Sequence, residues 1–131
     1  MRTIRMISAF ILGIIAGGAL AQLETRTSAS QGVTVKATPK TLTAGAPVWE
    51  FIVVLETHSA ELSDDLTKTA ALLGPDGKRI APVAWEGAAA GGHHREGVLR
   101  FEPIIPAPAT VELQIQRPGE SAPRAFRWEL K

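Results

Sequence analysis

The chain has 131 residues, a formal charge of +1, 21% charged residues and no cysteine. This length accommodates one domain with a single core. The absence of cysteine excludes disulfides, thiol catalysis and blue-copper sites. Because the charge is close to zero, the composition argues against nucleic-acid binding, which needs a basic surface.

The N-terminus has the pattern of a secretory leader. Arg2 and Arg5 precede an apolar run that ends in the small-x-small triplet ALA at residues 19–21. That order is typical of a signal peptide cleaved before Gln22. Removal of the two arginines changes the formal charge from +1 to −1, so an anionic membrane would attract the mature domain little. We expect a signal helix at residues 1–21 and a periplasmic or secreted protein, membrane-anchored only if the leader is retained.

The remaining chain predicts a short spacer and an all-β domain. Residues 22–32 are small and polar, which predicts a flexible spacer. Residues 33–131 predict one β-sandwich domain, because apolar residues alternate with polar ones between Gly- and Pro-containing turns. About seven strands are predicted, at residues 33–38, 49–57, 69–73, 79–85, 97–101, 111–116 and 125–130. This spacing predicts an antiparallel, immunoglobulin-like sandwich whose last two strands form a terminal hairpin.

Three local features refine the prediction. In the strand WEFIVVLET at residues 49–57, alternate apolar residues share one face, so we expect a central strand with Trp49 in the core. Trp128 is predicted to be a core residue, and Trp85 either packs in the core or walls a site. Ser63, Asp64 or Asp65 can cap a short helical turn, and GPDG at residues 74–77 predicts the turn of a hairpin.

The histidines offer the most specific chemistry. His93 and His94 follow three alanines and two glycines in AAAGGHHREG, which predicts a flexible loop, and His58 follows the central strand. Neutral imidazole binds Zn(II) and Cu(II), and loops at one end of a sandwich cluster in space. We therefore predict a metal site at His58, His93 and His94, to which Asp64, Asp65 or Glu86 can add oxygen ligands. An exposed polar loop, or a structural histidine–carboxylate contact, explains the same residues without a metal.

No catalytic residue is predicted. His58, Ser59 and the aspartates at 64 and 65 supply the residue types of a hydrolase triad, but adjacent Ser and His side chains rarely face each other. No G-x-S-x-G turn and no glycine-rich phosphate loop are present.

The segments WEFIVVLETHSAELSDDL, APVAWEG and GGHHREGVLRF together resemble a group of small exported bacterial proteins without an assigned activity. The resemblance covers residues 49–101 and includes Trp85 and all three histidines. It carries no known ligand or catalytic role. The sequence thus predicts an exported binding protein for a divalent transition metal. The alternative is a metal-free module that binds another protein of the cell envelope.

Overall fold

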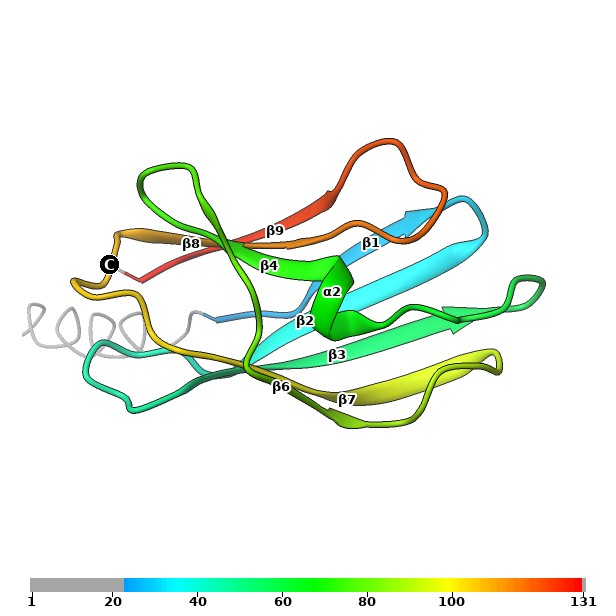
Figure 1. The fold of residues 1–131 in the computed structure, drawn as a ribbon, viewed down its shortest axis with the longest axis horizontal. Coiled ribbons are helices and arrows are strands. Elements are labelled where there is room, and N and C mark those ends of the chain that lie inside the picture. The colour runs from blue at the N-terminus through cyan, green and yellow to red at the C-terminus, as the bar shows by residue number, and fades with distance from the viewer. Residues whose placement is uncertain (1–22, 131) are drawn as a thin grey trace, which may run out of the picture.

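The computed structural model describes residues 23–130, so the predicted signal helix at residues 1–21 lies outside the described residues. The described chain is an all-β fold, in which two antiparallel sheets face each other (Figure 1). Among the described residues, no helix is both long and apolar enough to cross a membrane.

The first sheet has five strands in the order β1-β2-β3-β7-β6. These are β1 (Arg26–Ser30), β2 (Val33–Thr41), β3 (Trp49–Thr57), β7 (His94–Phe101) and β6 (Ala84–Gly87). The second sheet has four strands in the order β5-β4-β8-β9. These are β5 (Arg79–Ile80), β4 (Ala70–Leu73), β8 (Thr110–Ile115) and β9 (Arg124–Glu129), and the short helix α2 (Leu66–Thr69) precedes β4.

The core lies between the two sheets and is rich in aromatic side chains. Phe51 of β3 packs edge-on against Phe101 of β7, with ring centroids 5.7 Å apart. On the other side it meets Trp128 of β9 at 5.4 Å, so its contacts join the two sheets. Trp49 and Trp128 are buried, which confirms both core predictions. Burial of each such side chain favours folding by about 1.5–3 kcal/mol.

Several sequence predictions are confirmed. The central strand β3 spans Trp49–Thr57 as predicted, and β8 and β9 form the terminal antiparallel pair. The turn at residues 74–77 joins β4 to β5, which pair antiparallel. Asp65 is the N-cap of α2, since its carboxylate accepts a hydrogen bond from the Thr67 backbone N–H at 3.1 Å.

The prediction of a flexible spacer over residues 22–32 is wrong for Arg26–Ser30, which form β1 and pair with β2. This strand carries no alternating apolar pattern because it lies at a sheet edge and is largely exposed. Arg124 of β9 supports it by donating hydrogen bonds to the carbonyls of Ser28 and Ser30, each at 3.0 Å. The domain therefore begins with a strand where the sequence pattern indicated a spacer.

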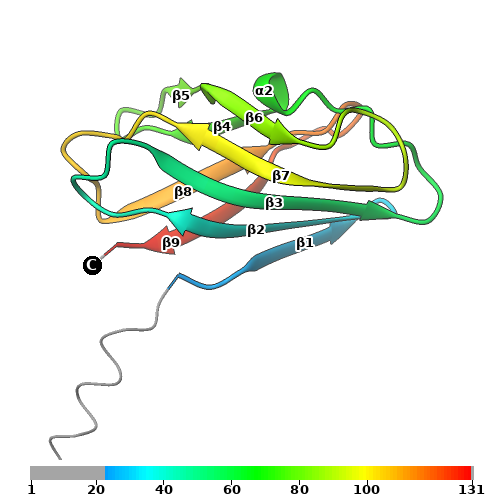
Figure 2. The same cartoon turned by 90° about the horizontal axis from the view of Figure 1, so that it is seen from below.

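The predicted strand over residues 79–85 is two strands in two different sheets. β5 ends at Ile80 in the second sheet, and the chain then crosses to the first sheet, where β6 pairs with β7 (Figure 2). Pro82 lies in the crossing segment, where it need not donate a ladder hydrogen bond. The crossing places β6 beside the strand that carries His94.

Candidate functional site

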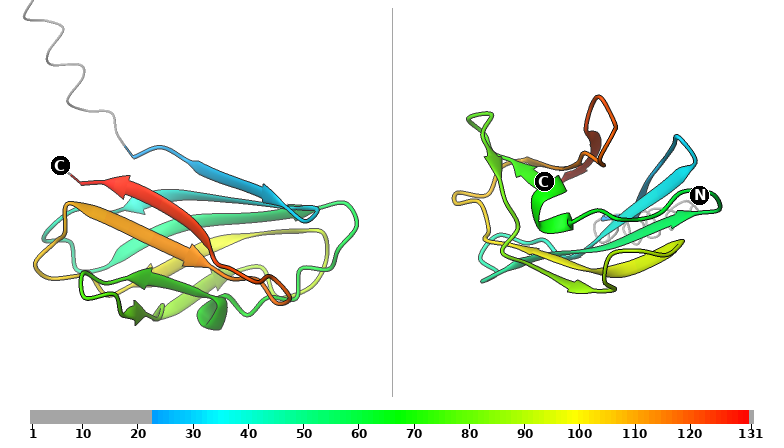
Figure 3. Two further views of the ribbon diagram at one scale, coloured as in Figure 1. Left: turned by 90° about the horizontal axis from the view of Figure 1, so that it is seen from above. Right: turned by 45° about the vertical axis from the view of Figure 1, so that its right-hand side comes forward.

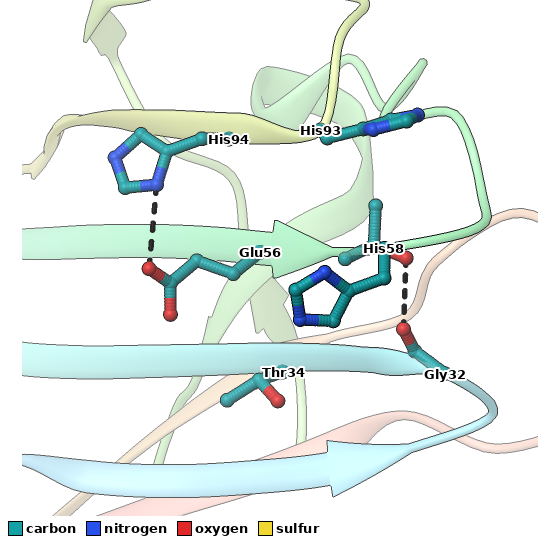
Figure 4. Close-up of a pocket in the computed structure, with 7 residues that line it drawn as sticks. Gly32, Thr34, Glu56, His58, His93 and His94 are labelled. Atoms are coloured by element: carbon teal, nitrogen blue, oxygen red, sulfur yellow. Dashed lines mark hydrogen bonds and ion pairs between the residues drawn. The ribbon is translucent and has the colours of Figure 1, made fainter.

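His94 is held in register with an acidic residue. It begins β7 and lies opposite Glu56 of β3, so the prediction that both adjacent histidines lie on a loop is wrong for His94. Paired residues of antiparallel strands project from the same face. The Nδ1 atom of His94 accordingly lies 3.3 Å from an oxygen of Glu56 (Figure 4).

His58 is positioned by the end of β3. The preceding residue, Thr57, donates its backbone N–H to the carbonyl of His93 and its hydroxyl to the carbonyl of Gly32, at 3.0 and 2.8 Å. The ring of His58 extends over Thr34, on the same side as Glu56 and His94 (Figure 4). Three backbone segments thus meet at Thr57, directly before His58.

His93 points differently from its neighbour. Its ring is directed away from those of His94 and His58 (Figure 4). This follows from strand geometry, because consecutive residues entering a strand project to opposite sides. His93 and His94 are both exposed, so water reaches both rings.

All three histidines nevertheless line one open hollow of about 360 Å³ at this end of the sandwich. The full lining is Gly32, Thr34, Glu56, Thr57, His58, His93 and His94. Glu96 lies 3.7 Å from Nε2 of His94, so carboxylates flank both ring nitrogens. Lys36 offsets part of that negative charge, since its ammonium lies 3.6 Å from Glu56. Glu56 is therefore in contact with both His94 and Lys36.

The side chains of the hollow are not arranged around a common point. Within residues 23–130, the structure contains no group of three or more His, Cys, Asp or Glu side chains positioned to hold a metal ion. Metal coordination requires nitrogen and oxygen ligands about 2.0–2.2 Å from the ion. A metal in this hollow therefore requires at least one histidine ring to turn from its present position.

The acids predicted to assist the histidines lie elsewhere. Asp64 is buried in an ion pair with Arg117, and Asp65 caps α2, where the Thr67 hydroxyl lowers the pKa of its carboxyl group. Glu86 pairs with Arg100, and this contact lowers the pKa of Glu86. None of these three acids lines the hollow. They are therefore not in place to add oxygen ligands to a metal there, nor to complete a catalytic triad with His58 and Ser59.

Arg95 supports the hollow from inside and was not identified from the sequence. Its side chain is buried and lies 5.7 Å from the ring centre of Trp85. It donates hydrogen bonds to the carbonyls of Leu62, Asp64 and Ala88, at 3.2, 2.7 and 3.2 Å. Arg95 thus fixes the loop after His58 to the loop before His93, and only its burial, which the sequence does not display, reveals this role.

The chain matches no protein-family model, no curated protein and no solved structure in the three comparisons made.

Proposed function

We propose that the chain is an exported binding protein that captures a divalent transition metal, Zn(II) or Cu(II), at the hollow lined by His58, His93 and His94. One observation supports this proposal above the others. The chain has only three histidines, and all three line the same hollow although the first and the second are 35 positions apart in the sequence. Imidazole is the commonest protein ligand for these ions.

The ligand set begins with His94, His58 and Glu56, because these three project from the same side of the sheet. His93 joins by movement of the preceding loop, where Gly91 and Gly92 have φ values of +113° and +77°. Since the rings must rearrange, part of the coordination energy is spent on that change. The proposed site is therefore a loose one, suited to buffering or delivering a metal outside the cytoplasm.

The proposal also covers the fold that carries the site and the cellular location of the protein. We propose an immunoglobulin-like sandwich, which the two antiparallel sheets and their shared aromatic core support. Export rests on the leader pattern at residues 1–21 and on the resemblance to small exported proteins. The protein then acts by binding and not by catalysis, since Asp64 and Asp65 are engaged by Arg117 and by α2.

Thermal unfolding of the domain from residue 22 to 131, purified without a histidine tag, tests the proposal. Zn(II) or Cu(II) should raise the melting temperature of the wild type, because a ligand that binds only the folded state stabilises it. His94→Ala should abolish the shift, and His58→Ala and Glu56→Gln should reduce it. His93→Ala should have a smaller effect because its ring is directed away from the other two.

Glu129→Gln is the matched control, since Glu129 is exposed on β9 in the second sheet. It should bind metal as the wild type does. If the His58→Ala/His94→Ala double variant responds to metal like the wild type, the hollow is not the site and the proposal fails.

The alternative is a metal-free module that binds an envelope protein. The observation that favours it is β6, which pairs only with β7 and forms an edge of the first sheet. An edge strand offers backbone groups to a partner strand. Under this alternative, metals leave the melting temperature unchanged, and a photo-crosslinker at exposed Glu86 captures the same envelope protein in repeated experiments, whereas one at Glu129 does not.

A further inference from the structure

A separate pocket of about 290 Å³ lies between α2 and β6 and shares no lining residue with the histidine hollow. The helix α2 contacts both β4 of the second sheet and β6 of the first, and it lies at the side of the sandwich between the two sheets (Figure 3). The pocket is therefore on the side where β6 forms the edge of the first sheet. We call it the Trp85 pocket, and the apolar part of its lining is Leu66, Trp85, Ala89 and Ala90.

Arg95 lines the Trp85 pocket although it is only 2% exposed. Its three hydrogen bonds all go to backbone carbonyls, which carry no formal charge, and within residues 23–130 it forms no ion pair with a carboxylate. The two other buried arginines of this part of the chain, Arg117 and Arg124, each pair with a carboxylate. A buried charge is costly unless it is paired, so Arg95 lacks the kind of partner that the other two have.

One hydrogen-bond donor of Arg95 is also unused. Its Nε atom is buried and, among the described residues, has no hydrogen-bond partner. A buried donor without an acceptor destabilises a fold, so this atom points to an acceptor that the described chain does not supply. A water molecule offers an acceptor but no charge, whereas a carboxylate offers both.

The two acids of the lining already have partners of their own. Asp64 forms an ion pair with Arg117, and the carboxylate of Asp65 lies 3.9 Å from the ammonium of Lys68. The charged residues of the lining are Asp64, Asp65 and Arg95. Of these, Arg95 alone has no ion-pair partner in the part of the chain that the structure describes, so the pocket favours a negatively charged ligand.

We propose that the Trp85 pocket binds a small organic carboxylate, whose charge pairs with Arg95 and whose apolar part packs against Trp85 and Leu66. Arginine suits this ligand because its planar guanidinium can donate two parallel hydrogen bonds to a carboxylate. The apolar lining favours an organic anion over an inorganic one. The ring of Trp85 lies 5.7 Å from the guanidinium and is partly exposed, and it turns aside to let the carboxylate reach Nε.

Trp85 itself reports on the pocket, because Trp49 and Trp128 are buried in the core and Trp85 alone is partly exposed. The purified protein is titrated at pH 7 with hexanoate, with neutral hexanamide of matching size, and with sulfate. Hexanoate should change the tryptophan emission in a saturable way. Calorimetry should give hexanoate an affinity at least about tenfold higher than that of hexanamide, which lacks the charge, and higher than that of sulfate, which lacks an apolar part.

Two results of these titrations would overturn the proposal. The first is the absence of a saturable response to hexanoate. The second is equal affinity for hexanoate and either of the other two probes, because the pocket would then select neither for charge nor for an apolar part.

Substitutions locate the site. Ala90→Leu fills the pocket from an exposed loop position, so it should weaken hexanoate binding by about tenfold or more without lowering the melting temperature. The matched control is Ala125→Leu, at an exposed alanine of β9 outside the lining, which should bind hexanoate as the wild type does. Arg95→Met should abolish binding, but it also removes hydrogen bonds of the fold, so Ala90→Leu decides the location. Unchanged affinity in Ala90→Leu would place the ligand elsewhere and overturn the proposal.

Discussion

Arg117 holds Asp64 through two hydrogen bonds: its Nε and Nη2 atoms lie 2.9 and 3.0 Å from the two carboxylate oxygens. The side chain of Asp64 is fully buried and that of Arg117 nearly so. Asp64 lies in the loop after β3, whereas Arg117 follows β8, so the ion pair connects the first sheet to the second. Removal of the Asp64 charge leaves the buried Arg117 with only a longer contact to Glu120, at 3.9 Å, and breaking a buried pair in this way is costly.

Asp64→Asn should therefore lower the free energy of unfolding by about 3–5 kcal/mol, because it removes the charge but keeps the size of the side chain. The measurement is urea unfolding at pH 7. The neighbouring change Asp65→Asn is the control: Asn caps helices about as well as Asp, so its effect should be far smaller. Equal losses from the two variants would contradict a specific role for the buried pair.

The strands that could be predicted are those with one face in the core. In β3, β8 and β9, nearly all the alternate residues that face the other sheet are apolar, and that period is visible in the sequence. β1 has no such period, since polar edge positions meet water on most sides. The sequence pattern merges β5 and β6 into one strand, because the pairing of β6 with β7 depends on a crossing between the sheets, which local sequence does not encode.

The gathering of the three histidines at one hollow was predictable, but the geometry of the hollow was not. They line the same hollow because the loops that follow β3 and precede β7 share an end of the sandwich, as this architecture leads one to expect. The contact between His94 and Glu56 depends on strand register, which cannot be read without knowing the pairing. Arg95 resembles any surface arginine in the sequence, because burial of a charge is set by the whole fold.

Glu120 should make stability depend on acid pH. Its carboxylate forms two hydrogen bonds with Arg124, at 3.0 and 2.6 Å, and this contact lowers the pKa of Glu120. A carboxyl group with a lower pKa in the folded state stabilises the fold above its unfolded pKa, near 4.3. That contribution is lost as the pH falls through the lower, folded pKa.

As the pH is lowered from 5, the free energy of unfolding should fall in the wild type. It should fall less in Glu120→Gln, which lacks this carboxyl group. Urea titrations at a series of pH values measure it. Glu129→Gln, which changes an exposed glutamate on β9, is the control and should keep the wild-type slope. An unchanged slope in Glu120→Gln would show that the pair with Arg124 does not contribute.

Arg95→Met should loosen the histidine end of the domain. Methionine fills similar space but removes the donor. The carbonyls of Leu62 and Ala88 keep the Gly91 N–H and the Trp85 indole as donors, whereas the carbonyl of Asp64 loses this partner. A buried acceptor without a partner costs about 1–3 kcal/mol, so a loss of that order or more is expected. Hydrogen exchange should accelerate at the backbone N–H of Gly91, which bonds to Leu62. Exchange in β8 should accelerate less, and equal acceleration in both places would argue for general destabilisation instead.

Gly97→Ala should separate β6 from β7. A Cβ atom at this position would lie 2.6 Å from the carbonyl oxygen of Glu86 and 2.7 Å from the ring of Trp85. Because backbone atoms of β6 are among these neighbours, the strands must move apart, and overpacking of this kind costs about 1–3 kcal/mol. Urea unfolding measures the loss, and Glu96→Ala, an exposed neighbour, is the control. If Gly97→Ala is as stable as that control, the close approach of the two strands is not needed for the fold.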